Sequence, residues 1–293
     1  MNNSIISKLK AIEIQTVSCC NSQCIVCPWI RIKDSVPVQS MSDRTWNKVL
    51  EGIGALDPEI IYPYNNNEPL LDKKMESRIL DIRSVSPCSE IELSTNGLLL
   101  TGKLSEFLVN RVDSILISLF GYDETSNSEL MGKGMSYNRI KQNILTLKKI
   151  NEENGSKCII SVAKLFDCPY ISNDDVLKDW IFWEDEGINM IFYKFIDRST
   201  RAGDFNQRDS TVKPCGCDFN RHHKSTFIRY NGDVNFCCHD WRNEYVTGNL
   251  NANSLIEIIN GEKYSQIRGM VDGTVASDTG FLCRKCFHCK TCG

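Results

Sequence analysis

The sequence lacks long apolar runs, an export signal and an excess of basic residues. The longest apolar stretches, such as residues 115–120, are far too short to cross a bilayer, and residues 1–10 contain no apolar signal-peptide core. With 34 basic and 37 acidic side chains, the formal net charge is −3, and no local basic patch stands out. The sequence therefore predicts a cytoplasmic protein that binds neither a membrane nor a nucleic acid.

Cysteine is the exception in an otherwise ordinary composition of 41% hydrophobic and 24% charged residues. The chain of 293 residues has 15 cysteines. Without an export signal, metal or redox chemistry explains this number better than disulfides do. Four cysteines lie within residues 19–27 and eight within residues 215–292. The remaining three, Cys88, Cys158 and Cys168, are expected to be small apolar core residues.

Between the two thiol-rich ends, strand-like and helix-like segments alternate. Such alternation predicts right-handed βαβ units and an α/β fold with a mainly parallel sheet, and six units fall short of a full eightfold barrel. The predicted strands are residues 11–17, 59–64, 90–94, 114–119, 158–165 and 189–195. The predicted helices are residues 43–54, 73–84, 102–110, 136–151 and 173–186, with Ser42 as an N-cap and Gly155 after the fourth helix.

A second, smaller module follows. Residues 225–230 and 233–238 alternate like strands around Asn231-Gly232, which predicts a tight hairpin, and residues 253–260 are expected to form a short helix. We therefore divide the chain into a core at residues 1–205 and a C-terminal domain at residues 206–293.

Three cysteines directly follow the first predicted strand, in the pattern Cys20-x3-Cys24-x2-Cys27. Three thiolates without a fourth suit a cubic [4Fe–4S] cluster with one open iron better than a closed tetrahedral zinc site. The alternative is a zinc knuckle that a distant ligand completes. Cys19 is a second candidate for the first position, but the x3 spacing favours Cys20.

This motif resembles the signature of the radical S-adenosylmethionine (SAM) enzymes. The resemblance implies a partial (β/α)6 TIM-type barrel, here with a small C-terminal cysteine-rich module of a β-hairpin plus a helix. It also implies a [4Fe–4S] cluster held by three cysteines and SAM, and a reducing partner such as flavodoxin or ferredoxin. Such an enzyme reductively cleaves SAM to a 5′-deoxyadenosyl radical, which abstracts a substrate hydrogen.

The same resemblance assigns SAM contacts to residues at the ends of the second, third and fourth predicted strands. Asn67 stands where the family usually has glycine, and Val26 where many members have an aromatic residue. Neither position is a cluster ligand. The implied SAM-binding residues are Asn67, Glu68, Pro69, Ser94, Asn96 and Ser118.

The C-terminal cysteines resemble the auxiliary-cluster half of the SPASM/twitch subfamily, on the pattern Cys217-x14-Gly232-x4-Cys237 followed by Cys283-x2-Cys286. The resemblance implies at least one auxiliary [4Fe–4S] cluster, and eight thiols permit two. Zinc is the alternative metal. Cys215 is a rival of Cys217, and Cys289 and Cys292 are left unassigned.

Cys238 follows the predicted ligand Cys237. Successive residues on a strand point to opposite faces, so both are not expected to bind one cluster. Some radical SAM epimerases return a hydrogen to the substrate from a cysteine thiol. We hypothesise that Cys238 is such a catalytic donor; the alternatives are a half-buried small residue and a ligand of a second cluster.

The relatives that carry a twitch module include dehydrogenases and epimerases of sugar-type substrates. The resemblance thus favours a radical SAM oxidoreductase or epimerase that acts on a carbohydrate-type or other small natural-product substrate. A maturase of a peptide or protein is the second candidate, although only ten residues precede the first predicted strand and no N-terminal leader-binding domain is expected. The third candidate is a zinc or iron–sulfur sensor without catalysis.

Overall fold

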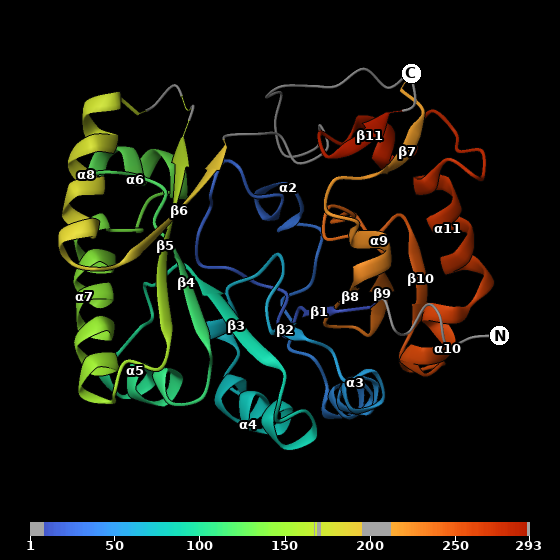
Figure 1. The fold of residues 1–293 in the computed structure, drawn as a ribbon, viewed down its shortest axis with the longest axis horizontal. Coiled ribbons are helices and arrows are strands. Elements are labelled where there is room, and N and C mark those ends of the chain that lie inside the picture. Colours follow the sequence, from blue (N-terminus) through green and yellow to red (C-terminus); the bar gives the residue numbers. More distant parts are fainter. Residues whose placement is uncertain (1–8, 167, 169–170, 195–211, 292–293) are drawn as a thin grey trace.

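The computed structural model describes residues 9–166, 168, 171–194 and 212–291. Six parallel strands follow one another across the sheet in chain order, which confirms the predicted α/β fold and partial barrel (Figure 1). These strands are β1 (Ala11–Ile14), β2 (Ile60–Tyr62), β3 (Glu90–Thr95), β4 (Ser114–Ser118), β5 (Ile159–Phe166) and β6 (Asn189–Lys194).

Helices follow the strands along the chain and cover one face of the sheet (Figure 1). The predicted start of the first long helix is observed, because Ser42 Oγ accepts a hydrogen bond from Thr45 N over 3.2 Å. The helices of this part are α2 (Trp29–Ile32), α3 (Asp43–Leu56), the 3-10 helix η1 (Pro69–Leu71), α4 (Met75–Val85), α5 (Gly102–Val109), α6 (Glu124–Met131), α7 (Tyr137–Glu153) and α8 (Asn173–Asp185).

Helix α6 has no counterpart among the predicted helices. Its sequence, ETSNSELM, is mostly polar, so the apolar periodicity that marks an amphipathic helix is missing. A capping box between Asp123 and Ser126 begins it instead. The side chain of Asn127 then ties it down by donating to Met135 O over 2.6 Å and accepting from Gly121 N over 3.1 Å.

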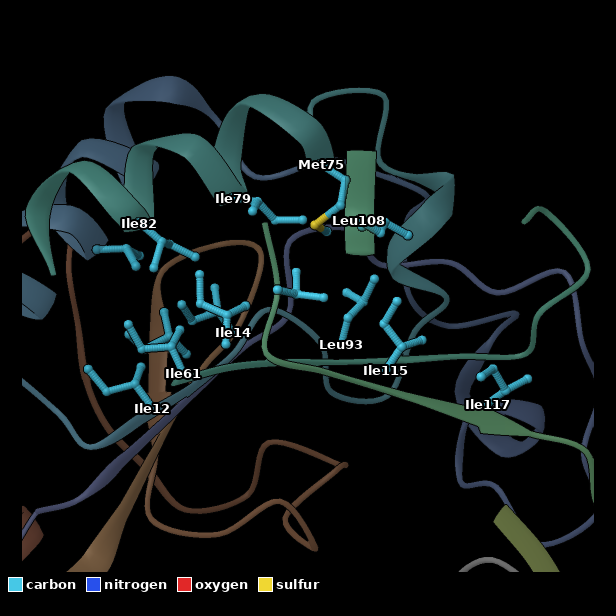
Figure 2. Packing of buried hydrophobic residues seen from close by; sticks show 14 of the residues in the cluster. Ile12, Ile14, Ile61, Met75, Ile79, Ile82, Leu93, Leu108, Ile115 and Ile117 are labelled. Atoms are coloured by element: carbon cyan, nitrogen blue, oxygen red, sulfur yellow. The ribbon is translucent and has the colours of Figure 1, made fainter. Parts of the chain in front are cut away.

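Apolar side chains fill the space between the sheet and the helices. Figure 2 shows Ile79 and Ile82 of α4 packed towards Ile12, Ile61 and their neighbours on the strands, and all four are fully buried. Burying one such side chain contributes about 1.5–3 kcal/mol. Since side chains alternate along a strand, the residues between them point to the opposite, inner face of the sheet.

The C-terminal module continues the same sheet. Strand β8 pairs in parallel with β1, and β9 and β10 extend the sheet antiparallel to each other, giving nine strands in the described residues. The hairpin lies where it was predicted, and Gly232 in its turn has φ +88°, which favours glycine. The strands are β8 (Ser225–Ile228), β9 (Asp233–Asn235) and β10 (Val246–Asn249).

Two short strands, β7 (Pro214–Cys217) and β11 (Cys289–Thr291), pair antiparallel and bring the end of the described chain back to the start of this module. The proposed boundary between residues 205 and 206 lies outside the described residues. The described helices include none long and apolar enough to cross a membrane. The remaining helices are α9 (Arg221–Lys224), α10 (Leu255–Asn260), α11 (Glu262–Asp272) and the 3-10 helix η2 (Leu282–Lys285).

Candidate functional site

The loop that carries Cys20, Cys24 and Cys27 follows β1. Its backbone turns at the second and third cysteines, where Cys27 N donates to Cys24 O over 3.0 Å. Ser22 supports the first two thiols: its N–H donates to Cys20 Sγ over 3.4 Å, and its hydroxyl lies 3.0 Å from Cys24 Sγ. Burial, followed by the charge of Cys27, raises the pKa of Cys24 to about 12. Several buried thiols this close ionise readily only when a cation shares the site, which fits a metal cluster.

Helix α6, which the sequence did not predict, anchors this loop. Gln23 N donates to Met131 O over 2.9 Å, and Ile25 N donates to Leu130 O over 3.0 Å. The helix ends at Gly132, whose φ is +93°, and a Cβ there would lie 3.0 Å from the Gln23 side chain. The close approach and the backbone angle both require glycine, so the end of α6 fixes the position of the cysteine loop.

Glu68 is buried next to this loop, with 2% of its surface exposed. Its carboxylate accepts hydrogen bonds from Leu70 N (3.1 Å), Thr95 Oγ1 (2.7 Å) and Asn96 N (2.8 Å). Its own N–H donates to Cys19 O over 2.9 Å. Burial outweighs these hydrogen bonds and raises the pKa of Glu68 to about 7. A cation bound here would favour the ionised carboxylate, so Glu68 is suited to hold an ammonium group.

Three of the other predicted SAM-binding residues, Asn67, Pro69 and Asn96, lie next to Glu68 in the chain or contact it. Asn96 Nδ2 donates to Asn21 Oδ1 of the cysteine loop over 2.7 Å, and Pro69 begins η1. Asn67 Oδ1 accepts from Asn65 N over 2.8 Å, whereas its buried Nδ2 has no hydrogen-bond partner within the described residues. A buried donor without a partner is costly, so a ligand acceptor at Asn67 fits this site.

Ser94 and Ser118 are half-buried residues of β3 and β4. Ser94 lies opposite Leu116 in the register of these strands. Both serines alternate with buried apolar residues that face the helices, so they lie on the inner face of the sheet. Cys19, the alternative to Cys20, lines a separate cavity beside Asp72.

Five C-terminal cysteines line a single cavity beneath the small β7–β11 sheet. Cys215 and Cys238 are not among the described residues that line it. Cys292, the last cysteine, lies outside the described residues. The lining cysteines are Cys217, Cys237, Cys283, Cys286 and Cys289.

The cavity cysteines influence one another. Burial, followed by the charges of Cys286, Cys289 and Cys217, raises the pKa of Cys283. Cys217 lies opposite Cys289 in the β7–β11 register, which brings the two ends of the module together. Four or more thiols around one buried space are the ligand set of an iron–sulfur cluster or a zinc ion.

Arg221 lies beside these thiols and was not predicted from the sequence. It also lines the cavity. Burial by itself lowers the pKa of Arg221, but the charges of Cys238, Cys237 and Glu13 outweigh it and raise that pKa. Arg221 thus supplies positive charge to a site of several thiolates. The only sequence signal for this role is that Arg221 lies near Cys217 in the chain.

The prediction that Cys237 and Cys238 lie on a strand and point to opposite faces is wrong. Strand β9 ends at Asn235, so neither cysteine belongs to a strand, and the alternation of strand residues does not apply. The two thiols interact: a hydrogen bond from Cys238, followed by burial, raises the pKa of Cys237. Cys238 therefore lies next to the cavity cysteines instead of pointing away from them.

Two further contacts surround the thiol sites. Trp241 packs with Trp29 and Ile32 in a small buried cluster that Cys20 and Cys27 border, so the C-terminal module contacts the first cysteine loop.

A separate group consists of two histidines and one carboxylate, whose ligand atoms lie within 4.8 Å of one another. Its hydrogen bonds of 2.7 and 2.8 Å join α9 to α11. The members of this group are His222, His223 and Asp272.

The fold and the thiol sites define an α/β partial-barrel protein with a C-terminal metal-binding module. Residues 209–290 match the SPASM family, an iron–sulfur cluster-binding domain. A comparison with curated proteins finds no match.

Solved structures share the fold at low sequence identity. BtrN in complex with AdoMet and 2-DOIA is 16% identical with a TM-score of 0.59, over 90% of this chain and 87% of that chain. Streptococcus suis SuiB bound to the precursor peptide SuiA is 13% identical with a TM-score of 0.72, over 95% of this chain and 70% of that one. Native anSMEcpe with bound AdoMet is 13% identical with a TM-score of 0.63, over 87% of this chain and 81% of that one.

The family match thus shows a SPASM iron–sulfur cluster-binding domain at residues 209–290, and the solved structures show that the chain shares their fold.

Proposed function

We propose that the chain binds a [4Fe–4S] cluster at Cys20, Cys24 and Cys27 together with SAM, and dehydrogenates or epimerises a carbohydrate-type or other small natural-product substrate. The observation that carries this proposal is the hydrogen bond of 2.9 Å from Glu68 N to Cys19 O, which holds a buried carboxylate against the cysteine loop. A cluster and the amino group of SAM need these two parts at fixed positions relative to each other.

When bound, the cluster and SAM supply an electron transfer that cleaves SAM and starts hydrogen abstraction from the substrate. The residues of the chain hold and orient the reactants. Glu68 accepts hydrogen bonds from an ammonium group, and its own three hydrogen bonds prevent it from turning away. The unpartnered Nδ2 of Asn67 donates to a carboxylate or ribose oxygen. Ser94 and Ser118 offer hydroxyls from the inner face of the sheet.

We propose that Cys217, Cys237, Cys283 and Cys286 hold an auxiliary [4Fe–4S] cluster. Their common cavity supports Cys217 over its rival Cys215, and it adds Cys289 as a fifth candidate. Arg221 partly offsets the negative charge of four thiolates, which makes the site easier to reduce. In a dehydrogenase, the cluster that these cysteines would hold would supply an acceptor for the second electron of the oxidation; in an epimerase, the thiol of Cys238 would supply a hydrogen atom.

The small-molecule assignment is supported by the fold shared with BtrN over nearly the whole of both chains, since that structure holds 2-DOIA as well as AdoMet. A peptide or protein substrate is the second candidate. It is supported by the fold shared with SuiB, whose structure holds a precursor peptide. We also propose a cytoplasmic location and a reductant such as flavodoxin or ferredoxin, because free thiol ligands persist in a reducing compartment.

Anaerobic reconstitution followed by metal analysis and a SAM-cleavage assay tests this function. Since each cubane carries four irons, we expect about eight irons per chain for two clusters, or about twelve for three. The reduced protein is expected to release 5′-deoxyadenosine from SAM. Zinc in place of iron, or iron without any SAM cleavage, would leave the sensor as the better description.

A further inference from the structure

Two of the four histidines of the chain are adjacent in the sequence, at positions 222 and 223. They lie on the short helix α9, and both rings are hydrogen-bonded to Asp272, the last residue of α11. His222 Nε2 lies 2.7 Å from Asp272 Oδ1, and His223 Nε2 lies 2.8 Å from Asp272 Oδ2. Two imidazole nitrogens and a carboxylate thus come together from two helices that are well separated in the chain.

This group offers the ligand atoms that zinc and related transition metals prefer. Imidazole nitrogen and carboxylate oxygen are common zinc ligands, and three protein ligands leave one position for water. All the ligand atoms lie within 4.8 Å of one another. A tetrahedral ion with bonds of about 2.0–2.2 Å holds its ligand atoms about 3.4 Å apart. The hydrogen-bonded nitrogens and oxygens therefore need to separate by only about 0.6 Å to accept the ion.

The side chains are in the charge states that a metal requires. Burial lowers the pKa of His222, against the opposing effect of Asp272, so the ring is neutral at physiological pH. Burial by itself raises the pKa of Asp272, but the hydrogen bonds of the two histidines outweigh it and lower that pKa. A metal at Nε2 moves the proton of the ring to Nδ1. Because His222 Nδ1 has no hydrogen-bond partner within the described residues, this change breaks no hydrogen bond there.

The group is fixed on its buried side and accessible on the other. Arg268 of α11 donates from Nε to His222 O over 2.9 Å and from Nη1 to Ile259 O over 2.8 Å, which holds α9 against α11. The charge of Arg268 comes last among the causes that shift the pKa of His222, so it opposes a bound cation only weakly. The side chain of His222 is 2% exposed, but those of His223 and Asp272 are 26% and 35% exposed. An ion can therefore enter past these two residues and retain water.

The same helices form part of the wall around the C-terminal cysteines. His222 of α9 and Val271 of α11 both line the cavity that contains Cys217. An ion held between the two helices would fix this part of the wall without using any thiol. Its position is that of a structural metal site, which stabilises the module around the cysteines.

We propose that His222, His223 and Asp272 bind one zinc ion, with water as a further ligand, in a structural site that joins α9 to α11. This site goes beyond the proposed function, since it uses no cysteine and takes no part in the cleavage of SAM. Its ligands are nitrogen and oxygen only, at about 2.0–2.2 Å, whereas zinc at a cysteine site has sulfur ligands at about 2.3 Å. The two kinds of zinc are therefore distinguishable by bond length.

Zinc binding to the full-length chain tests the inference after the clusters are reconstituted anaerobically and unbound metal is removed by desalting. Titration with zinc chloride in a calorimeter gives the affinity, and X-ray absorption at the zinc edge gives the ligands. We expect one zinc per chain with nitrogen and oxygen ligands. Asp272→Asn and His223→Gln should each weaken zinc binding by at least about 10-fold. Glu262→Gln, which removes an exposed carboxylate from the other end of α11, should leave the affinity unchanged.

Iron content and circular dichroism are measured on the same samples. Lost zinc binding in Asp272→Asn, with the iron content and the fold of the wild type, supports the inference. If a variant does not fold, the zinc ligands of the wild-type chain decide. Absence of zinc binding by the wild type overturns the inference, as does zinc held through sulfur or an affinity unchanged in both variants. None of these outcomes depends on SAM cleavage, so a failure of the proposed function is seen separately.

Discussion

Replacing Glu68 with glutamine separates the charge of this residue from its shape. The amide keeps one oxygen for the donors Leu70 N and Thr95 Oγ1, but it places an NH2 group where the second oxygen accepts from Asn96 N. Losing a hydrogen bond to a charged ligand costs about 1.5–3 kcal/mol. We therefore expect Glu68→Gln to weaken SAM binding by about 10- to 100-fold.

The same substitution has the opposite effect on the stability of the protein without SAM. The pKa of Glu68 is raised by burial from 4.5 to about 7, so the folded state binds this proton more tightly than the unfolded state does. The contribution of the Glu68 carboxyl to the free energy of unfolding is fully present below pH 4.5 and is lost as the pH rises through 7. At pH 8 the buried, ionised carboxylate lowers the free energy of unfolding by about 3 kcal/mol, and glutamine avoids this loss. The new donor–donor contact between the glutamine NH2 group and Asn96 N lowers the free energy of unfolding of the variant by about 1–3 kcal/mol.

Two assays on one preparation check this prediction. Calorimetry of SAM binding to the reconstituted protein is expected to show the loss of affinity, while urea unfolding at pH 8 shows a free energy of unfolding equal to that of wild type or up to about 2 kcal/mol higher. Glu106→Gln, which removes an exposed carboxylate on the outer helix α5, serves as the matched control and changes neither quantity. Unchanged SAM affinity in Glu68→Gln would refute the role that we give to this carboxylate.

Three further predictions concern the C-terminal module. Cys217→Ser is expected to lose about four irons per chain and Cys215→Ser none, by iron analysis after reconstitution; the reverse would make Cys215 the ligand. If Cys238 donates a hydrogen, Cys238→Ala loses the epimerised product but still forms 5′-deoxyadenosine, and undiminished product formation would end that hypothesis. Arg221→Gln removes positive charge beside the thiols, so a redox titration followed by electron paramagnetic resonance should show a more negative auxiliary potential; an unchanged potential would contradict this role.

The fold was predictable because its signals are local. Alternation of apolar residues and a cap such as Ser42 depend on neighbours in the sequence, and the structure has a strand or helix at each predicted place in the barrel. Helix α6 was not predicted, because its residues are mostly polar and the contacts that hold it are tertiary. Likewise, the strand predicted to reach Cys238 ends at Asn235, where the chain turns towards the thiol cavity.

The candidate site was predictable only where a motif marks it. Cys20 and Glu68 each belong to a recognisable pattern, and the structure brings their segments into contact. Glu13 and Arg221 belong to no pattern, since they meet only when β8 and α9 pack beside β1. Residues that act through tertiary contacts of this kind cannot be found from spacing along the chain.

The central claim is that the first cysteine loop and Glu68 hold the cluster and SAM. Its most direct test is 5′-deoxyadenosine release by the reduced protein, compared with a variant in which Cys20, Cys24 and Cys27 are all replaced by alanine. We expect release from the wild type and none from the variant, which should still retain about four irons at the auxiliary site. Equal release from both proteins would contradict the claim.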